Sequence, residues 1–504
     1  MKDKILKVGK IIFYFSSIFL LILAIIYRTK VWLFEPGFFG DEGALISNLQ
    51  KRNLWQLFLP LDENQCCPPF VLCCFKLLYV LFGLNETALR FFSYLSGLAS
   101  LILAFFVGRK VFKFEATSLL LITFMFFHVD LVYYSQEFKQ YSSDVFFALL
   151  MPFVFLLFKD KIVTVKQALC FGIFLGLSGF ASLPSEFAVV PICFYFLFKY
   201  LKEKKYKLLL SMSLPYILLS ACLFFLMVLG TLKGGMLGLS MWAEGCDTFK
   251  SLETVKSLFD FILGYKFVLI TQFMFLAGII YLAIKDRLLL LLFGAPILLN
   301  IIFGYCHLYP FTESRVILWL TPFTMIIAFK LIDVFKTKND IANIIFEILI
   351  FSCAIFCFFN FDKTKIDKIS ANVPYYFYRS NAREYVEKLE KQSVKPDDII
   401  FVDAQGQGIF GVYDKNHKYH GKNVIYQNYQ QDLSYFDPNQ IIISKQVKHI
   451  DDLPKGTCIW FYNSSLYGEE VFSENVALWI SENTKVLRKE TDAFGDFYYT
   501  KKIK

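Results

Sequence analysis

Two adjacent carboxylates stand out in this sequence because they follow the first long apolar run closely. Asp41 and Glu42 lie in the stretch FFGDEGAL, residues 38–45. A carboxylate pair can take a proton from a hydroxyl group as a general base, hold a divalent cation, or simply remain solvated. The pair alone leaves all three alternatives open, so its meaning depends on which other groups reach the same place.

A second set of polar side chains lies in YYSQEFKQY, residues 133–141, at the end of another apolar run. Helical spacing places Gln136 and Lys139 on one face, and Glu137 and Tyr141 on an overlapping face. An interfacial belt of aromatic residues explains the tyrosines, but it does not explain Ser, Gln, Glu and Lys together. Gln136, Glu137, Lys139 and Tyr141 are therefore candidates for substrate binding.

Arginine is rare in the first 360 residues and is confined to six positions: Arg28, Arg52, Arg90, Arg109, Arg287 and Arg315. A guanidinium group suits bidentate phosphate contacts, so Arg90 and Arg315, at the ends of apolar runs, are candidate phosphate ligands. The alternative is that either side chain snorkels to a lipid headgroup. Arg315 lies in the polar run HLYPFTESR, which also supplies Tyr309 as a candidate.

The composition requires that these groups are carried by a membrane protein. The chain has 504 residues, of which 56% are hydrophobic and 19% charged, and its mean hydropathy is +0.50. One soluble core cannot bury that much apolar surface. We therefore expect a polytopic α-helical membrane module over residues 1–360 and a small soluble α/β domain over residues 361–504. The lysines lie in short loops, where topology accounts for them, so no nucleic-acid partner is expected.

About eleven transmembrane helices are predicted, because apolar runs of about 17 to 25 residues recur and about 30 Å of hydrocarbon must be crossed. They cover residues 11–31, 91–108, 117–134, 143–158, 167–183, 185–199, 208–230, 267–284, 288–304, 316–334 and 342–360. The run at 68–83 would reach only about 24 Å and carries Lys76. We expect it to form a helix on the outer leaflet, within an external loop at 32–90.

Loop charge sets the orientation of these spans. The predicted cytoplasmic loops hold 20 Lys and Arg in 48 residues, whereas the external loops hold about 10 in some 115. By the positive-inside rule, the N-terminus of this plasma (inner) membrane protein is cytoplasmic and the C-terminal domain extracytoplasmic. The first span lacks a small-residue cleavage site and is expected to be retained. All the candidate residues then lie on the external side, where we expect one site.

The polar C-terminal segment, residues 361–504, is predicted to form a small, partly parallel sheet with helices. A helix is predicted over 380–391, and buried strands over 397–402, 439–444 and 457–462. Gly406, Gly408 and Gly411 match the spacing of a dinucleotide-binding loop. That function would require a βαβ unit and a cytoplasmic cofactor pool, so we interpret the glycines as a turn.

The order of these motifs resembles the glycosyltransferase-C (GT-C) superfamily, near its protein mannosyltransferase and aminoarabinose transferase branches. The resemblance covers most of the first 330 residues and rests on the Asp-Glu pair, Pro68-Pro69, an Arg, YSQE, and a late YPF with an Arg. It implies a GT-C-like fold and a sugar donor that is a polyprenyl-phosphate lipid. It further implies that Asp41 is the catalytic base with Glu42 as its companion. Lys139 stands where many relatives carry Arg.

The predicted function is transfer of a hexosyl or pentosyl group from a polyprenyl-phosphate-linked donor to an acceptor hydroxyl at the outer membrane face. Arg315, Lys139 and Arg90 would hold the donor phosphate, and the acceptor (glycan, lipid or protein) stays open. No cofactor is indicated with certainty, and a divalent metal ion also stays open. The alternative is a transporter or flippase of lipid-linked sugars, although we find no internal repeat of the kind such proteins carry. A third interpretation is a structural membrane protein whose external domain binds a partner.

Overall fold

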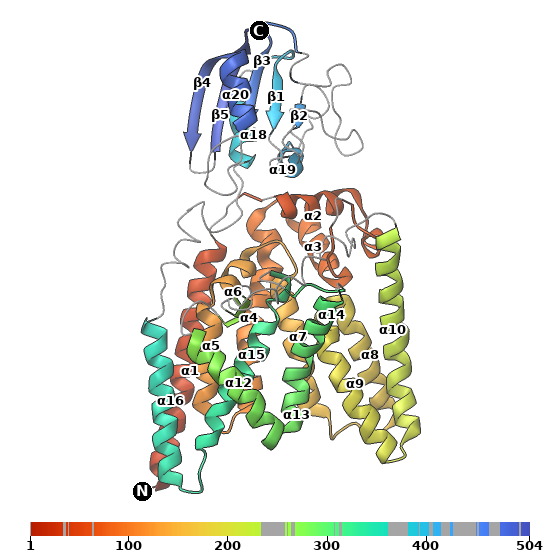
Figure 1. Cartoon of the computed structure of the whole chain (residues 1–504), viewed down its shortest axis with the longest axis vertical. Coiled ribbons are helices and arrows are strands. Elements are labelled where there is room, and N and C mark those ends of the chain that lie inside the picture. The colour runs from red at the N-terminus through yellow and green to blue at the C-terminus, as the bar shows by residue number, and fades with distance from the viewer. Residues whose placement is uncertain are drawn as a thin grey trace. The chain divides into compact units, whose positions relative to one another are not determined.

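The chain forms two compact units in a computed structural model (Figure 1), and each is described by itself. The first unit comprises Met1–Leu33 and Asn53–Ile366, and the second Phe34–Arg52 and Asp367–Lys504. The segment Phe34–Arg52, expected in the external loop of the membrane module, is thus grouped with the C-terminal unit. The structure describes residues 2–33, 37–38, 40–62, 65–232, 258–259, 261–263, 268–306, 308–311, 315–360, 382–392, 394–402, 407–414, 424–426, 450, 453–462, 474–492 and 495–504.

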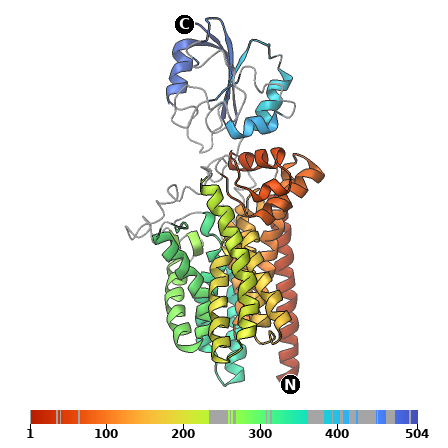
Figure 2. The ribbon, with the colours of Figure 1, turned by 90° about the vertical axis from the view of Figure 1, so that its right-hand side faces the viewer.

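The first unit is a bundle of apolar helices (Figures 1 and 2). Its helices are α1 (Lys2–Trp32), α3 (Pro69–Phe82), α4 (Glu86–Val111), α5 (Glu115–Phe127), α6 (Val129–Tyr133), α7 (Tyr141–Phe158), α8 (Val165–Ala181), α9 (Ser185–Lys202), α10 (Tyr206–Leu232), α12 (Val268–Lys285), α13 (Arg287–Leu289), α14 (Ala295–Tyr305), α15 (Leu320–Lys330) and α16 (Asp340–Asn360). The short turns η1 (Trp55–Phe58), η2 (Tyr134–Gln136), η4 (Leu290–Gly294), η5 (Arg315–Ile317) and η6 (Leu331–Phe335) join or extend them.

Each predicted span coincides with a helix or with a run of consecutive helices. Among the described residues, six helices are long and apolar enough to cross a membrane: α1, α4, α7, α10, the run from α13 to α14, and α16. The others are shorter, like α8 and α12, or carry charges at their ends, like α9. This arrangement confirms a multi-pass helical membrane protein.

The run at 68–83 forms the separate helix α3, as predicted. Pro69 occupies its first turn, where the missing N–H costs nothing. The helix ends at Gly83, whose φ of +66° is a left-handed conformation that favours glycine. Phe75 is buried, whereas Leu77 and Val80 are exposed. With 14 residues, α3 is too short to cross the hydrocarbon layer.

The predicted span 117–134 is not one straight helix, because it breaks at His128. Helix α5 and the α6–η2 segment meet at an angle of 70°. His128 has an extended backbone (φ −70°, ψ 112°), and its Nδ1 accepts the N–H of Leu131 at 3.4 Å. The extended residue stops the hydrogen-bond ladder of α5, and the imidazole caps the start of α6. The chain therefore re-enters a helix in a new direction.

The second unit contains a five-stranded mixed sheet of order β2-β1-β3-β5-β4. Strand β1 runs parallel to β2 and β3, whereas β5 runs antiparallel to β3 and β4. The partly parallel sheet is as predicted, although the predicted strand at 439–444 lies outside the described residues. The elements are α2 (Gly40–Lys51), α18 (Ala382–Lys391), β1 (Ile399–Val402), α19 (Gln407–Tyr413), β2 (Val424–Tyr426), β3 (Cys458–Tyr462), α20 (Glu474–Asn483), β4 (Thr484–Asp492) and β5 (Gly495–Lys502).

Different helices cover the two faces of this sheet (Figure 2). Strand residues alternate between the faces, so Phe461 packs against Trp479 of α20 while Tyr462 stacks on Tyr385 of α18. The ring centroids of Tyr385 and Tyr462 are 4.2 Å apart. Both faces of β3 are therefore buried, as its apolar sequence predicts.

Two of the three motif glycines in the tail do not form the turn that we predicted, and Gly406 lies outside the described residues. Gly408 and Gly411 lie inside α19, which follows β1 directly in the order of elements. Ile409 and Phe410 are fully buried, and burial of this apolar stretch explains why it forms a helix. The described glycines thus belong to a short helix rather than to a phosphate-binding loop.

Candidate functional site

The stretch 133–141 turns sharply, so the predicted grouping of its side chains on helical faces is wrong. Helical structure ends at Gln136, Glu137 is extended, and the N–H of Lys139 donates to the carbonyl of Glu137 at 2.8 Å. Phe138, at the tip of this turn, is fully buried and packs on Phe75 of α3, with ring centroids 4.1 Å apart. Burial of this one ring fixes the positions of Glu137 and Lys139 on either side of it.

Lys139 is held on two sides by neighbouring segments. Its carbonyl accepts a hydrogen bond from Ser93 Oγ of α4 at 2.9 Å, and its Nζ donates to Gln65 Oε1. The next residue, Gln140, donates from Nε2 to the carbonyl of Cys66 at 3.2 Å. Lys139 is only 4% exposed, and a buried ammonium group persists only where polar groups surround it. The structure thus provides a positioned cation inside the first unit.

Arg315 reaches the same region from a distant part of the sequence. Its Cζ lies 5.4 Å from the centre of the Tyr141 ring, a cation–π distance, and the rings of Tyr141 and Tyr134 are 5.2 Å apart. Tyr133 donates its hydroxyl to Glu137 Oε1 at 3.4 Å. Two predicted substrate-binding residues, Arg315 and Tyr141, are therefore in contact.

Tyr309 belongs to the same neighbourhood. Its hydroxyl donates to the carbonyl of Val316 at 3.0 Å. Burial, together with the nearby groups Asp144, Cys66 and Tyr141, raises the pKa of Tyr309 well above its usual range. The phenol therefore stays protonated and acts as a hydrogen-bond donor.

Asp144 is a further candidate residue, which the sequence analysis missed. It lies in the first turn of α7, is 6% exposed, and is close enough for its charge to act on Cys66 and Tyr309. An acid three residues after Tyr141, inside an apolar span, was a readable signal because charged groups at membrane depth are costly. We call the following residues the polar cluster: Tyr134, Glu137, Lys139, Tyr141, Asp144, Tyr309 and Arg315.

Two further predicted residues lie close to this cluster: Gln136 precedes Glu137 in the chain, and Arg90 lies in α4 near the residue that binds Lys139. Gln136 is 6% exposed, and neither polar atom of its amide has a hydrogen-bond partner among the described residues. A buried amide in that condition can satisfy the hydroxyl groups of a ligand. Arg90 is also buried and lies one helical turn before Ser93, the residue that binds the Lys139 carbonyl.

Asp41 and Glu42 lie in the second unit, in the first turn of α2. Glu42 is fully buried and Asp41 half-buried, so the pair is not merely a solvated loop feature. Carboxylates at a helix N-terminus are stabilised by the helix dipole. Within this unit α2 packs against α19, and the N–H of Phe38 donates to the hydroxyl of Tyr413 at 2.8 Å. The acids therefore start a helix that the C-terminal domain supports.

The sequence did not decide whether the protein binds a divalent metal ion. Among the residues that the structure describes, no group of three or more His, Cys, Asp or Glu side chains is arranged to hold a metal ion. Asp41 and Glu42 supply two carboxylates. No cofactor is established for this chain.

Cys66 is expected to react slowly with alkylating reagents at neutral pH. Burial, reinforced by the carboxylate of Asp144 and opposed by Lys139, raises the pKa of Cys66 to about 11. Only the thiolate is nucleophilic, so labelling should increase as the pH rises toward that value. Mass-spectrometric mapping after iodoacetamide treatment at several pH values measures this, with the exposed Cys306 as a reference for access. Equal labelling of both thiols at pH 8 would contradict the described environment.

No model of a known protein family matches this sequence, and no curated protein matches it.

Solved structures do match the fold. The structure of ArnT from Cupriavidus metallidurans bound to undecaprenyl phosphate aligns with a TM-score of 0.58 and 11% identity, over 96% of this chain and 98% of that one. The same protein in the apo state gives 0.56 at 11% identity over the same shares. An Archaeoglobus fulgidus oligosaccharyltransferase in complex with Zn and sulfate aligns at 12% identity over 95% and 72% of the two chains, with a TM-score of only 0.47. The two ArnT alignments confirm the GT-C fold implied by the motif order.

Proposed function

We propose that this protein transfers a sugar from a polyprenyl-phosphate-linked donor to an acceptor hydroxyl at the outer face of the membrane. The observation that carries the proposal is the polar cluster, in which Arg315 lies over the ring of Tyr141 at the start of α7, and the buried Lys139 lies two residues before Tyr141 in the chain. Two cations and hydrogen-bond donors at that depth fit an anionic headgroup. The ArnT structure with the same fold has undecaprenyl phosphate bound, which is a lipid of this class.

An apolar cavity in the first unit supports a lipid donor. It has a volume of about 660 Å³, and apolar side chains of α12, α14 and α15, such as Phe275, Ile297 and Leu320, line it almost entirely. Phe311 also lines it, two residues after Tyr309 in the chain. A polyprenyl chain would gain about 0.8 kcal/mol for each CH₂ group buried in such a cavity.

The proposed chemistry assigns the predicted residues to two tasks. Asp41 takes the proton from the acceptor hydroxyl, whose oxygen attacks the anomeric carbon of the donor sugar. The bond from that carbon to the phosphate oxygen breaks, and the polyprenyl phosphate leaves with an additional negative charge. Lys139 and Arg315, aided by Arg90, stabilise that charge as it develops. Glu42 orients Asp41, while Gln136, Glu137, Tyr141 and Tyr309 bind donor or acceptor hydroxyl groups.

The test is a transfer assay with the full-length protein in membrane vesicles. Polyprenyl phosphates that carry radiolabelled hexoses or pentoses are supplied together with envelope acceptors, and movement of label from the lipid to the acceptor fraction is measured. Transfer that depends on Asp41 supports the proposal. Label that crosses the bilayer while it stays on the lipid contradicts it and favours the transporter.

One observation weakens the transporter alternative. Glu347, in α16, is an acidic residue inside a predicted span, the kind of group that can mark a transport pathway. Its Oε1 accepts the N–H of Ala116 at 2.7 Å, in the first turn of α5. The carboxylate thus caps a helix, and no role in a transport pathway is needed to explain it.

A further inference from the structure

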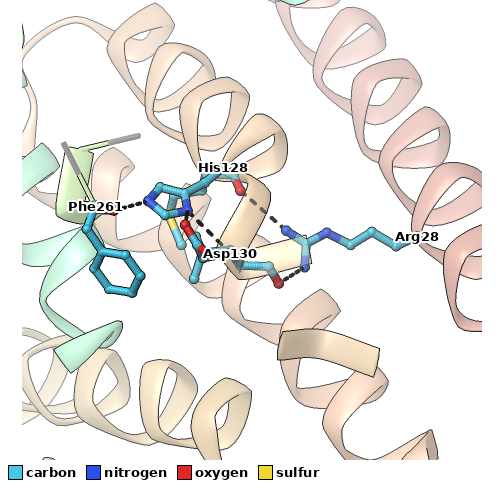
Figure 3. A network of polar contacts seen from close by, with 6 residues as sticks. Arg28, His128, Asp130 and Phe261 are labelled. Carbon is cyan, nitrogen blue, oxygen red and sulfur yellow. Dashed lines mark hydrogen bonds and ion pairs between the residues drawn. The ribbon is translucent and has the colours of Figure 1, made fainter. Parts of the chain in front are cut away.

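Arg28 is a buried cation in the first span that the proposed chemistry does not use. It lies in α1 and is 2% exposed. Its Nη1 donates to the carbonyl of Leu131 at 3.1 Å, and its Nη2 to the carbonyl of Met125 at 3.3 Å (Figure 3). A charged group at this depth is costly, so these contacts call for a reason.

The two carbonyls that Arg28 binds lie on opposite sides of the break at His128. Helix α5 ends at Phe127, so its last carbonyls lack helical donors and form the negative end of the helix dipole. Arg28 donates one hydrogen bond to the carbonyl of Met125 in α5 and a second to the carbonyl of Leu131 in α6. A planar guanidinium can hold two diverging acceptors at once, which an ammonium group cannot do in a fixed geometry. The side chain therefore fixes the angle between α5 and α6.

His128 holds the break from the other side. Its Nδ1 accepts the N–H of Leu131, so the proton is on Nε2, which donates to the carbonyl of Phe261 at 2.8 Å. In Figure 3, Arg28 and Phe261 approach His128 from opposite sides, with Asp130 between them. The bend is thus tied both to α1 and to the segment that contains Phe261.

Gly97 of α4 packs closely against both Arg28 and the segment after the bend. A Cβ at this position would lie 2.6 Å from Ser135 Cβ and 3.2 Å from Arg28 Nη1. The first distance is too short for any real contact, so a side chain here must displace the bend or the guanidinium. Glycine is therefore required for α4 to approach this closely.

We infer that Arg28 is a positioning residue that acts through the bend to place Glu137 and Lys139 for donor binding. This inference rests on the proposed function. The turn at Phe138 follows Leu131 after seven residues, and over a reach of about 10 Å a change of about 10° in the bend moves a group by about 2 Å. Misplacement of a binding group by about 1 Å can already reduce a rate about 100-fold.

The test uses Arg28→Lys and Gly97→Ala in the full-length protein with a polyprenyl-phospho-sugar donor. Each variant is expected to raise the donor KM about ten-fold. A merely structural role would instead lower the amount of active protein and leave the donor KM unchanged. Arg109→Lys is the matched control, because Arg109 binds Tyr14 and Glu115 elsewhere in the bundle, and its donor KM should equal that of the wild type.

A second measurement does not depend on activity. Hydrogen–deuterium exchange of peptides that cover residues 128–140 should become faster in both variants, while peptides from α16 exchange as in the wild type. A wild-type donor KM together with wild-type exchange in either variant overturns the inference. A wild-type protein that transfers no sugar counts against the proposed function instead, and the exchange data then decide alone whether Arg28 holds the bend.

Discussion

Asp41→Asn is expected to reduce sugar transfer by about 10²- to 10⁴-fold, the range that a general base contributes. The amide has the same shape as the carboxylate and can still accept hydrogen bonds at the start of α2, but it cannot take the proton from the acceptor hydroxyl. Asp41 is half-buried in the first turn of that helix, so the variant should fold. The rate is measured by transfer of label at saturating donor.

The controls for this variant distinguish the loss of a catalytic base from the loss of any negative charge in the loop. Asp62→Asn removes a carboxylate from the same predicted external loop and should leave the rate unchanged. Glu42→Gln should reduce the rate less than Asp41→Asn if Glu42 only orients its neighbour. A normal rate for Asp41→Asn, in protein that is inserted in normal amounts, would remove Asp41 from the catalytic role.

Arg315→Ala is expected to reduce transfer by about 10²- to 10³-fold, the usual cost of removing one donor that stabilises developing charge. The guanidinium lies over the Tyr141 ring, which helps to hold it in place. Arg315→Lys should restore part of the activity, because it keeps the charge but loses the bidentate geometry. Because the charge on the phosphate grows in the transition state, the loss should appear in kcat as well as in the donor KM.

Lys139→Met provides an independent check on the same phosphate. It removes a second cation of the polar cluster while it keeps an unbranched side chain only one atom shorter. The combined variant should lose less than the sum of the two single losses in free energy if both cations hold one group. Fully additive losses would indicate that Lys139 and Arg315 act on different parts of the substrate, and the shared phosphate site would then be wrong.

The sequence was sufficient for the membrane architecture because hydrophobic length is a local property. Each of the eleven apolar runs lies on helical structure, and Pro69 and Gly83 bound α3 by their own backbone preferences. The burial of strand β3 on both faces likewise follows from its run of adjacent apolar residues. The order of short motifs gave the GT-C fold although no family model matches the sequence.

The polar site was predicted only in part. Tyr141, Lys139, Tyr309 and Arg315 were chosen by residue type, and the structure brings them to one neighbourhood. The helical faces assigned to residues 133–141 were wrong, because burial of Phe138 against α3 turns the chain. That contact joins residues far apart in the sequence, so no local pattern could reveal it.

What the sequence determined by itself is thus the set of spans, two strands of the small mixed sheet and the residue types available for chemistry. The tertiary structure alone decided the bend at His128, the contacts of Arg28 and the place of Asp144 in the polar cluster. The reason is physical: the length and amphipathicity of a helix are encoded along the chain, whereas the partner of a buried polar group depends on which segments pack against it. Arg28 has the same local sequence whether it snorkels to a headgroup or binds one carbonyl in each of two other helices.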